Sequence, residues 1–394
     1  MQTNPQKIKV LLYGNIYRDY RSQILTKFLF DSGQHISIVC PDYYQNSRLA
    51  KIPAIDKLLA IFSLAELWLK APFTDVIYLP PMNSRFIKSA LLAAKLWQKQ
   101  LIVEMYISIY DTFVGDRKLL KGKQIEPDSR QAKRMLEKDR LALTKADYIV
   151  HTSSHELTYW EKIFDINIDR AKVFIAPNCN VSNLVRHQKL ERGVFEICWW
   201  GTFIPLHGLD NILQALKILA ANNTEFVCNL FGVDNALFAK YTAKIRQYGL
   251  EERVRLRKDL SFADGSLPNY LVANCDLALG IFGNTDKAYN AVPNKLIEAL
   301  SMGIPTLTMS APALQEFFDP QSDLWTCEAT PQAIAESINN IINGDAVAVD
   351  WEQTRQKVLN TFSVKRYREI VERVLATTAN SETSKVEQQA LASY

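Results

Sequence analysis

The segment NAVPNKLIEALSMGIPT (290–306) groups three polar side chains of different chemistry on one short helix. Its first proline, Pro293, suits the start of that helix, and Gly303 suits the end. On a 3.6-residue wheel, Asn294, Lys295 and Glu298 share one face. An ammonium beside a helix start suits a diphosphate, and a carboxylate one turn later suits vicinal hydroxyl groups. Spacing alone favours a plainer interpretation, a solvated helix face with a surface Lys–Glu pair.

A second segment, WWGTFIPLHGLDNILQALKIL (199–219), runs from an apolar strand through a turn into a helix. Gly201 and Gly208 bound the turn and would let a ligand approach the backbone closely. The start of the following helix again favours an anion. Two glycines around a turn more often serve only the turn, and this is the structural alternative.

The loop YGNIYRDYR (13–21) follows the first apolar run and carries Gly14, Arg18 and Arg21. A loop after a parallel strand lies at the carboxyl edge of its sheet, where ligands bind in α/β proteins. The two arginines could therefore face a ligand. They could equally lie on the solvent side of the first helix, and the residues alone leave both open.

His151 and His155 stand four residues apart, a spacing that can bind zinc. No third ligand follows with metalloprotease spacing, so a core or capping role is favoured for both. The sequence also contains no Walker loop, no Gly-x-Ser-x-Gly elbow and no GxGxxG fingerprint.

Short apolar runs that alternate with helical patterns must position these residues. The predicted strands are 9–13, 36–40, 75–79, 101–107, 147–151 and 172–176 in the first half, and 195–200, 226–232, 254–257, 276–282 and 305–309 in the second. Helical patterns in the second half cover 209–221, 235–248, 267–274, 293–302 and 331–342. Two successive series of this kind predict an α/β chain with two Rossmann-like, doubly wound domains facing across a cleft.

The domain boundary should lie where both periodicities stop, in the polar stretch 178–194. We therefore expect an N-terminal Rossmann-like domain at 1–182 and a C-terminal Rossmann-like domain at 183–361. An amphipathic helix at 362–377 should follow and pack back on the N-terminal domain. The polar end, 378–394, reads as a disordered tail.

The stretch PNKLIEALSMGIPTLTM (293–309) resembles the donor-site helix of GT-B glycosyltransferases of family 4 (group 1), which retain anomeric configuration. The resemblance is to the branch with Pro-Asn-Lys before the conserved Glu. In that family this Glu binds the ribose of the donor nucleotide, which implies that role for Glu298. FIAPNCNV (174–181) and FSVKRYREIVERVL (362–375) resemble further parts of the family in the same order, so the resemblance covers nearly the whole chain.

The resemblance also identifies departures. Asn290 stands where the family has an earlier Glu, and either it or Lys295 could partly substitute. The family's loop Gly-Arg-x-x-x-x-Lys-Gly has Thr202 and His207 at its two cationic positions here. Arg18 and Arg21 could supply the missing charge.

Many relatives place a His near the anomeric carbon, in the loop that corresponds to SIYDTFVGD (108–116). Asp111 is the candidate replacement there and the candidate catalytic residue, although an Asp in such a loop more often caps a turn. Glu316 follows a Ser-Ala-Pro run where relatives also carry an acid, and a helix-start role explains it equally well.

The resemblance implies a glycosyltransferase of the hexosyltransferase type, without a cofactor or metal ion. Its N-terminal domain would hold the acceptor, and its C-terminal domain would hold a nucleotide-diphosphate sugar as donor. The acceptor would be a glycan, a lipid-linked glycan or a small molecule, as in polysaccharide biosynthesis. Two alternatives stay open: a nucleotide-sugar epimerase, and a catalytically degenerate GT-B protein that acts as a binding module.

Bulk composition sets broader limits. With 46 Lys+Arg against 42 Asp+Glu the chain carries only +4, too little to indicate nucleic acid as a partner. The six scattered cysteines and the absence of an apolar leader favour a cytoplasmic protein. Segments 53–71 and 84–99 combine Leu, Ile and Trp with lysines. They could contact the inner face of a membrane peripherally, but packing on the first sheet is the favoured interpretation.

Overall fold

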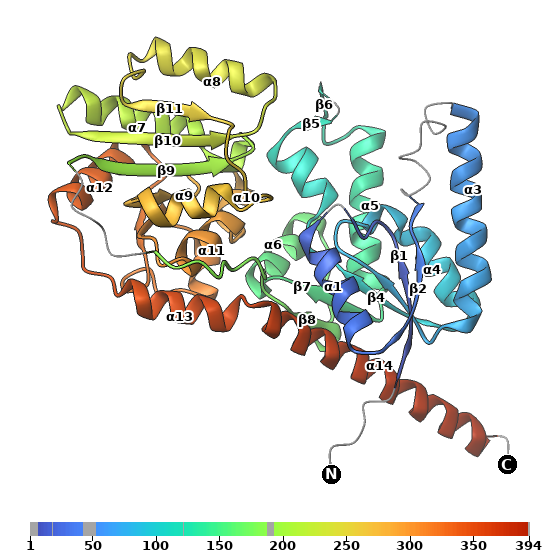
Figure 1. The fold of residues 1–394 in the computed structure, drawn as a ribbon. Coiled ribbons are helices and arrows are strands. Elements are labelled where there is room, and N and C mark those ends of the chain that lie inside the picture. The colour runs from blue at the N-terminus through green and yellow to red at the C-terminus, as the bar shows by residue number, and fades with distance from the viewer. Residues whose placement is uncertain (1–6, 18, 42–52, 121, 187–192, 393–394) are drawn as a thin grey trace. The chain divides into compact units, whose positions relative to one another are not determined.

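The computed structural model describes residues 7–17, 19–41, 53–120, 122–186 and 193–392 (Figure 1). The chain forms two compact units. The first contains the chain up to Val114, Lys118–Pro177 and the residues from Val364 onward, and the second contains Gly115–Arg117 and Asn178–Ser363. Each unit is built on its own six-stranded parallel sheet. The prediction of two α/β domains with parallel sheets is confirmed, and the second sheet has one strand more than expected.

The first unit has the strand order β2-β1-β3-β4-β7-β8. Its parallel strands are β1 (Lys9–Tyr13), β2 (His35–Val39), β3 (Val76–Leu79), β4 (Gln100–Glu104), β7 (Tyr148–His151) and β8 (Val173–Ile175), and β5 (Leu119–Leu120) and β6 (Lys123–Gln124) form a small hairpin. Its helices are α1 (Tyr20–Asp31), α3 (Pro53–Lys70), α4 (Ile87–Leu96), α5 (Arg130–Lys145), α6 (Ser154–Phe164) and α14 (Val364–Ala392).

The second unit has the strand order β11-β10-β9-β12-β13-β14. Its strands are β9 (Phe195–Gly201), β10 (Phe226–Gly232), β11 (Val254–Arg257), β12 (Leu277–Leu279), β13 (Thr306–Met309) and β14 (Trp325–Cys327). Its helices are α7 (Leu209–Ala221), α8 (Ala236–Gln247), α9 (Ser266–Asn274), α10 (Asp286–Asn290), α11 (Asn294–Ser301), α12 (Pro331–Asn343) and α13 (Trp351–Thr361).

Apolar side chains on both faces explain why these strands form buried parallel sheets. Along β9, Trp199 packs into the core beneath α7 and α12, and the next residue, Trp200, packs into a separate core with Leu271 of α9. Successive strand residues point to opposite faces, so one strand supports both cores. The strand order reverses between β9 and β12, which makes the carboxyl ends of these two strands the switch point of the second sheet.

Two segment boundaries differ from the sequence-based expectation. The second unit begins at Asn178, because Asn178 and Ser182 bond to residues of the loop before α11 and of α11 itself. Helix α14 continues to Ala392, through residues for which we expected a disordered tail. That tail contains three Ala, two Glu and two Gln among its 17 residues, and an existing helix extends cheaply through such residues.

A buried ion pair joins distant segments of the first unit. The guanidinium of Arg21, on α1, pairs with the carboxylate of Glu104 at the end of β4, and both side chains are fully buried. The same guanidinium donates to the carbonyl oxygens of Ala176 (2.7 Å) and Pro177 (2.9 Å). The hydroxyl groups of Tyr78 and Tyr367 each donate to Glu104 Oε2 at 2.9 Å. Helix α14 is thereby tied to the centre of the first sheet.

Replacing Arg21 with Met should destabilise the first unit by about 3–5 kcal/mol, because it leaves the Glu104 carboxylate buried without its counter-charge. Calorimetric melting of the purified chain measures this loss. Lys27→Met is the matched control on the same helix, since Lys27 pairs with Asp31 at 2.9 Å on the exposed surface. That control should change stability by no more than about 0.5–1 kcal/mol. Equal melting temperatures for the two variants would contradict the structural role of Arg21.

Candidate functional site

Helix α11 lies at the carboxyl end of β9 and carries the most informative residues of the sequence. Pro293 is its N-cap, and Asn294 is its first helical residue. Lys295 and Glu298 each contact one of the two tryptophans that end β9. The site therefore forms at the switch point of the second sheet, where α/β proteins bind their ligands.

The carboxylate of Glu298 is held in one orientation. Its Oε2 accepts a 2.7 Å hydrogen bond from Trp200 Nε1, and its Oε1 accepts a 3.1 Å bond from Asn180 Nδ2. The same Asn180 amide also donates to the backbone carbonyl of Asn294 at 3.0 Å. Burial raises the pKa of Glu298, while the bonds from Trp200 and Asn180 and the charge of Lys295 oppose that rise. A fixed acceptor of this kind can recognise hydroxyl groups.

Lys295 is not on a solvated helix face, which was the favoured plain interpretation. Only 6% of its surface is exposed, and its Nζ lies 4.2 Å from the centre of the Trp199 ring. Burial holds the pKa of Lys295 well below its usual value, and the negative Glu298 opposes that shift. The ammonium has no hydrogen-bond partner among the described residues.

Gly201 and Gly208 shape the turn beside Lys295. A Cβ on Gly201 would lie 2.7 Å from the ring of His207, and a Cβ on Gly208 would lie 2.1 Å from the backbone of Phe282. Gly208 also has φ +65°, a conformation that favours glycine. His207 packs edge-on against Trp199 with ring centres 5.6 Å apart. Gly201 thus lets His207 pack on the Trp199 indole, and Gly208 lets the turn pack on the backbone of Phe282.

His207 and Thr202 do not replace the cations of the family loop. Burial and then the nearby Lys295 hold the pKa of His207 well below its usual value, so its ring is neutral at neutral pH. Thr202 is exposed and uncharged. Lys295 is therefore the buried positive charge at this turn.

Three buried polar atoms around Trp199 have no hydrogen-bond partner in the part of the chain that the structure describes. They are Lys295 Nζ, His207 Nδ1 and the indole Nε1 of Trp199 itself. Buried polar groups are nearly always paired in folded proteins. The start of α7 at Leu209 adds the positive end of a helix dipole beside His207. An anion with several oxygens matches this set of groups.

Asn290 and Asn294 differ in what they can offer. Asn290 ends α10, and its Nδ2 donates to the backbone carbonyl of Asp286 at 2.7 Å. Asn290 was expected to substitute in part for the family's earlier Glu, but this bond already uses its side-chain NH₂ group. Asn294 begins α11 and is partly buried beside Asn180.

The first unit places its candidate donor contacts elsewhere than expected. Arg21 is buried in the ion pair with Glu104, so its guanidinium is engaged within the unit. Arg18 lies outside the described residues. Gly14 has φ +140°, and a Cβ there would lie 2.4 Å from the side chain of Asn83. Asn83 also bonds to the backbone N–H of Asn15, so an amide side chain fills the space above β1.

Asp111 begins a short π-helix, Asp111–Asp116, and is almost completely buried. Its Oδ1 accepts a bond from Tyr159 Oη at 3.0 Å, and its backbone N–H donates to Ser108 Oγ. Asp139 in turn accepts from that hydroxyl group at 2.6 Å. Burial first, opposed by these hydrogen bonds, raises the pKa of Asp139 to about 6. Asp139 holds this loop in place, and nothing in the sequence marked it.

His151, one of the two histidines set aside as a zinc site, is used within the fold. His151 Nδ1 bonds to the backbone carbonyl of Met105, and its Nε2 lies 3.5 Å from Glu156. The described residues contain no group of three or more His, Cys, Asp or Glu side chains placed to share a metal ion.

Trp199, Trp200 and Asn180 are site residues that sequence reasoning did not identify. The two tryptophans read as part of an apolar strand, and Asn180 as part of a linker. The sequence did contain two signals for these residues. An indole N–H at the end of a strand needs a hydrogen-bond partner, and Asn-x-Asn after a strand can form a hydrogen-bonded turn.

Lys295 should make stability depend on pH. The pKa of Lys295 lies well below 10.5 in the folded chain and returns to about that value on unfolding. At a pH between the folded-state and unfolded-state pKa, unfolding takes up a proton, so stability rises with pH there. Each unit of depression costs about 1.4 kcal/mol at neutral pH. Lys295→Met should therefore melt higher than the parent chain at pH 7, and the difference should shrink toward pH 10.

Melting curves without ligand across this range test the effect. Lys217→Met is the matched control, because Lys217 also lies over an aromatic ring, Tyr248 at 5.1 Å, but on the exposed surface. It should leave the pH slope unchanged. If the melting temperatures of the parent chain and of Lys295→Met changed with pH in parallel, the lowered pKa of Lys295 would be ruled out.

Comparison with known proteins supports one class of protein. A family model described as "Glycosyl transferases group 1" matches residues 183–358, which make up most of the second unit. No curated protein matches the sequence.

Solved structures are similar over nearly the whole chain. Anabaena HepE in complex with UDP has a TM-score of 0.64 at 13% identity, covering 94% of this chain and 100% of that chain. Sucrose-phosphate synthase from Thermosynechococcus elongatus has a TM-score of 0.65 at 14% identity, covering 98% and 100%. The lipopolysaccharide outer core galactosyltransferase WaaB has a TM-score of 0.60 at 16% identity, covering 94% and 99%. The chain therefore has the GT-B fold of these glycosyltransferases, and the match of its second unit supports a group 1 glycosyltransferase.

Proposed function

We propose that this protein transfers a sugar from a nucleotide-diphosphate sugar to an acceptor hydroxyl group with retention of anomeric configuration. The observation that carries the proposal is the pairing, on α11, of an oriented carboxylate with a buried ammonium that has no hydrogen-bond partner among the described residues. The carboxylate and the ammonium match the two polar parts of a donor nucleotide, its ribose and its diphosphate. Glu298 accepts from ribose hydroxyl groups, and Lys295 faces the diphosphate.

Several groups of the second unit complete the proposed donor site. Backbone N–H groups of the 201–208 turn and the start of α7 contact the diphosphate, beside His207 and Thr202. HepE was solved with UDP and with UDP-glucose. We therefore propose a uridine nucleotide as the first donor to test. Asn290 and Asn294 are proposed to contact the donor sugar.

The chemistry depends on stabilising the leaving group. The bond from the anomeric carbon to the diphosphate oxygen breaks, and the nucleoside diphosphate leaves with the electron pair. The acceptor oxygen bonds to the same face of that carbon, and its proton passes to the departing diphosphate oxygen. Fixed positive charge from Lys295 and a helix dipole stabilises the diphosphate as its charge grows, so we propose that no divalent ion is needed. Asp111 is proposed to lie beside the reacting sugar.

The acceptor is proposed to be a glycan, a lipid-linked glycan or a small molecule, as in polysaccharide biosynthesis, and the transferred sugar a hexose. The loops that follow β1 and β4 in the first unit are the proposed acceptor contacts. We further propose a cytoplasmic enzyme with a peripheral membrane contact.

Glu298→Ala should lower kcat/KM by roughly 10²–10⁴-fold, because hydrogen bonds to a charged group contribute about 1.5–3 kcal/mol each and a ribose offers two. Initial rates of transfer from a labelled UDP-sugar measure the loss. Glu252→Ala, at an exposed position of the same unit, is the control and should keep full activity. Unchanged kcat/KM in Glu298→Ala would remove the donor assignment.

A melting-temperature screen against UDP, GDP, ADP and their sugar conjugates tests the function itself. A ligand that binds only the folded chain raises apparent stability by about 2.7 kcal/mol at a hundred times its Kd. We expect a uridine nucleotide to raise the melting temperature of the parent chain but not that of Lys295→Met.

Three outcomes would contradict the proposal. No shift with any nucleotide would exclude the donor site. A shift without transfer to any acceptor would identify a binding module. Donor turnover without an acceptor, giving a new nucleotide sugar, would identify an epimerase.

A further inference from the structure

Helix α3 is apolar on two opposite sides. On one side Ser63, Leu67 and Ala71 are buried, and the latter two belong to the core of the first unit. The other side follows the helical spacing i, i+3, i+4, i+11 and is exposed: Leu58 by 54%, Ile61 by 64%, Phe62 by 59% and Leu69 by 71%. An amphipathic surface helix would place polar residues there. Apolar patches of this kind mark contact surfaces.

Apolar exposure continues onto neighbouring segments. Phe73, in the turn directly after α3, is 77% exposed. Helix α4 packs beside α3 and presents Leu92 and Leu96, each 57% exposed, on the same side as Lys88 and Lys95. Leucines that alternate with lysines on one helix face are typical of surfaces that lie in a membrane interface.

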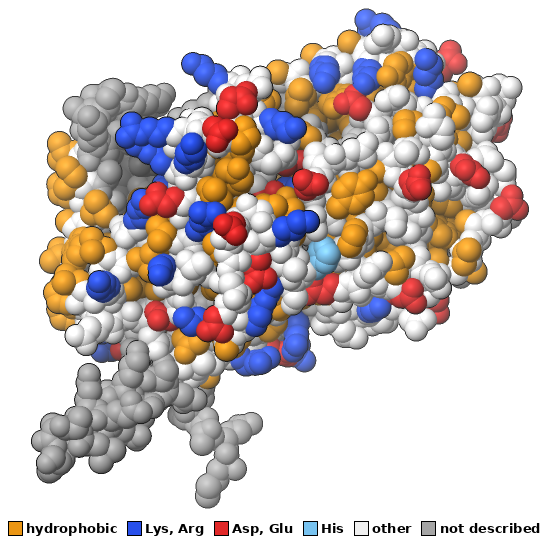
Figure 2. All heavy atoms as spheres, turned by 180° about the vertical axis from the view of Figure 1, so that it is seen from behind, with side chains coloured by type: hydrophobic (Ala, Val, Ile, Leu, Met, Phe, Trp, Pro, Cys, Tyr) orange, Lys and Arg blue, Asp and Glu red, His pale blue; other side chains and the backbone are white. Residues whose placement is uncertain are grey.

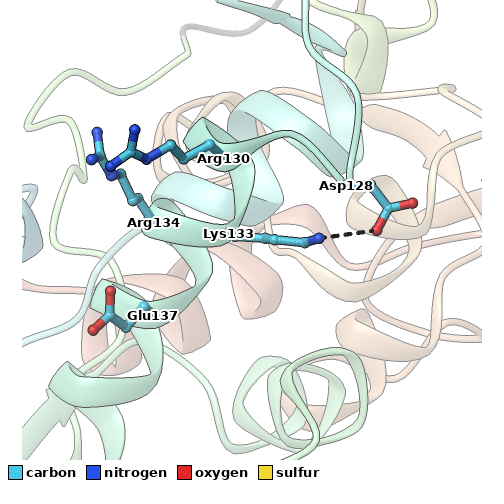
Figure 3. Close-up of a pocket in the computed structure, with 5 residues that line it drawn as sticks. All are labelled: Asp128, Arg130, Lys133, Arg134 and Glu137. Atoms are coloured by element: carbon cyan, nitrogen blue, oxygen red, sulfur yellow. Dashed lines mark ion pairs between the residues drawn. The ribbon is translucent and has the colours of Figure 1, made fainter.

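Helix α5, which packs beside α4, adds a cluster of positive charge. Arg130 and Arg134 are exposed and have no ion-pair partner among the residues described. Together with Asp128, Lys133 and Glu137 they line a hollow of about 540 Å³ (Figure 3). Lys133 pairs with Asp128 at 3.7 Å, so the arginines provide the unpaired charge of the hollow.

Acidic residues on these helices do not cancel this charge. Glu66 pairs with Lys70, and Glu137 pairs with Lys88. The pKa of Lys138 reflects this excess of positive charge. Burial lowers that pKa first, and the charges of Lys88, Arg85 and Arg134 lower it further, while the buried Asp139 partly opposes the shift. Cations thus crowd one another on the outer side of α4 and α5.

The outer sides of α3, α4 and α5 therefore form one surface, here called the α3–α5 face. It combines the exposed apolar stripe of α3, the Leu–Lys side of α4 and the arginines of α5. Figure 1 shows α3 at the right-hand edge, which becomes the left-hand edge of Figure 2, where hydrophobic side chains gather beside Lys and Arg.

We propose that the α3–α5 face docks the protein on an anionic lipid surface. Leucine and phenylalanine side chains enter the interface, and lysine and arginine side chains contact lipid phosphates, each adding to affinity. No described helix is long and apolar enough to cross a bilayer, so the contact is peripheral. This inference specifies the membrane contact included in the proposed function, but it does not depend on sugar transfer.

Charge favours lipid over a second copy of the chain. A two-fold dimer through this face would place the same basic patch on both partners, opposite itself. Like charges would then face each other across an apolar contact. An anionic lipid surface instead offers complementary charge over an extended area and matches both parts of the face.

Vesicle sedimentation of the full chain tests the proposal. We expect binding to phosphatidylcholine vesicles that contain about 30% phosphatidylglycerol, weaker binding to phosphatidylcholine alone, and loss of the difference at high salt. The triple variant Ile61→Gln, Phe62→Gln and Leu69→Gln should lower the partition coefficient roughly tenfold or more. Its matched control replaces exposed apolar residues of the second unit, Val233→Gln, Leu237→Gln and Val347→Gln, and should bind like the parent chain.

A charge variant tests the other component. Lys95→Gln, Arg130→Gln and Arg134→Gln should lower binding to anionic vesicles by about fivefold per charge, with little effect on neutral vesicles. Lys240→Gln and Arg255→Gln, both exposed in the second unit, are the controls. The UDP-induced melting shift, read on the same variants, should stay unchanged, which separates failure of docking from failure of the donor site.

Three results would overturn the proposal. The first is no binding to anionic vesicles, and the second is equal binding by the apolar triple variant and the parent chain. The third is light scattering that shows an oligomer which the apolar variant dissociates, with no vesicle binding. That result would make the face a protein interface.

Discussion

Keeping a charged lysine out of water is the constraint around which the second unit is arranged. The ammonium of Lys295 lies against Trp199 and is denied a hydrogen-bond partner among the described residues. Desolvation of this kind opposes folding unless a ligand later supplies the missing charge. His207 packs on the same indole beside Gly201, so buried polar groups without a partner in the described part of the chain gather at one point. Such preorganisation is what a leaving group needs.

The two sheets treat their switch points differently. In the second unit unsatisfied polar atoms of the described residues gather beyond the end of β9, while His207 packs beside Gly201 and the backbone of Phe282 packs beside Gly208. In the first unit the space above β1 is filled by Asn83, which bonds back to Asn15. The second sheet thus ends at an edge with unpaired polar groups that suits a phosphate, whereas the edge of the first sheet is closed by internal hydrogen bonds. The fold alone does not determine which edge holds a ligand, and the residues at the edge do.

Much of the fold was readable because buried parallel strands are continuous apolar runs. The prediction for 226–232 coincides with β10, and that for 254–257 coincides with β11. Strand β14, three residues long, was missed because so short a run has no period. Arg21 was assigned to the donor because the fate of a loop arginine depends on its partner, and Glu104 is 83 residues away. The setting of Glu298 was hidden for the same reason: Asn180 and Trp200 reach it only in the folded chain.

The tie between Tyr367 and Glu104 bears on how the chain is made. The central sheet of the first unit acquires one of its buried hydroxyl donors from α14, the final helix. A ribosome releases that helix only after the whole second unit has emerged, and domains usually fold as units in the order of their synthesis. The acid of the N-terminal sheet therefore lacks one of its hydrogen-bond donors until the second unit and α14 have been synthesised. The first unit can complete its core only after the second unit has been made.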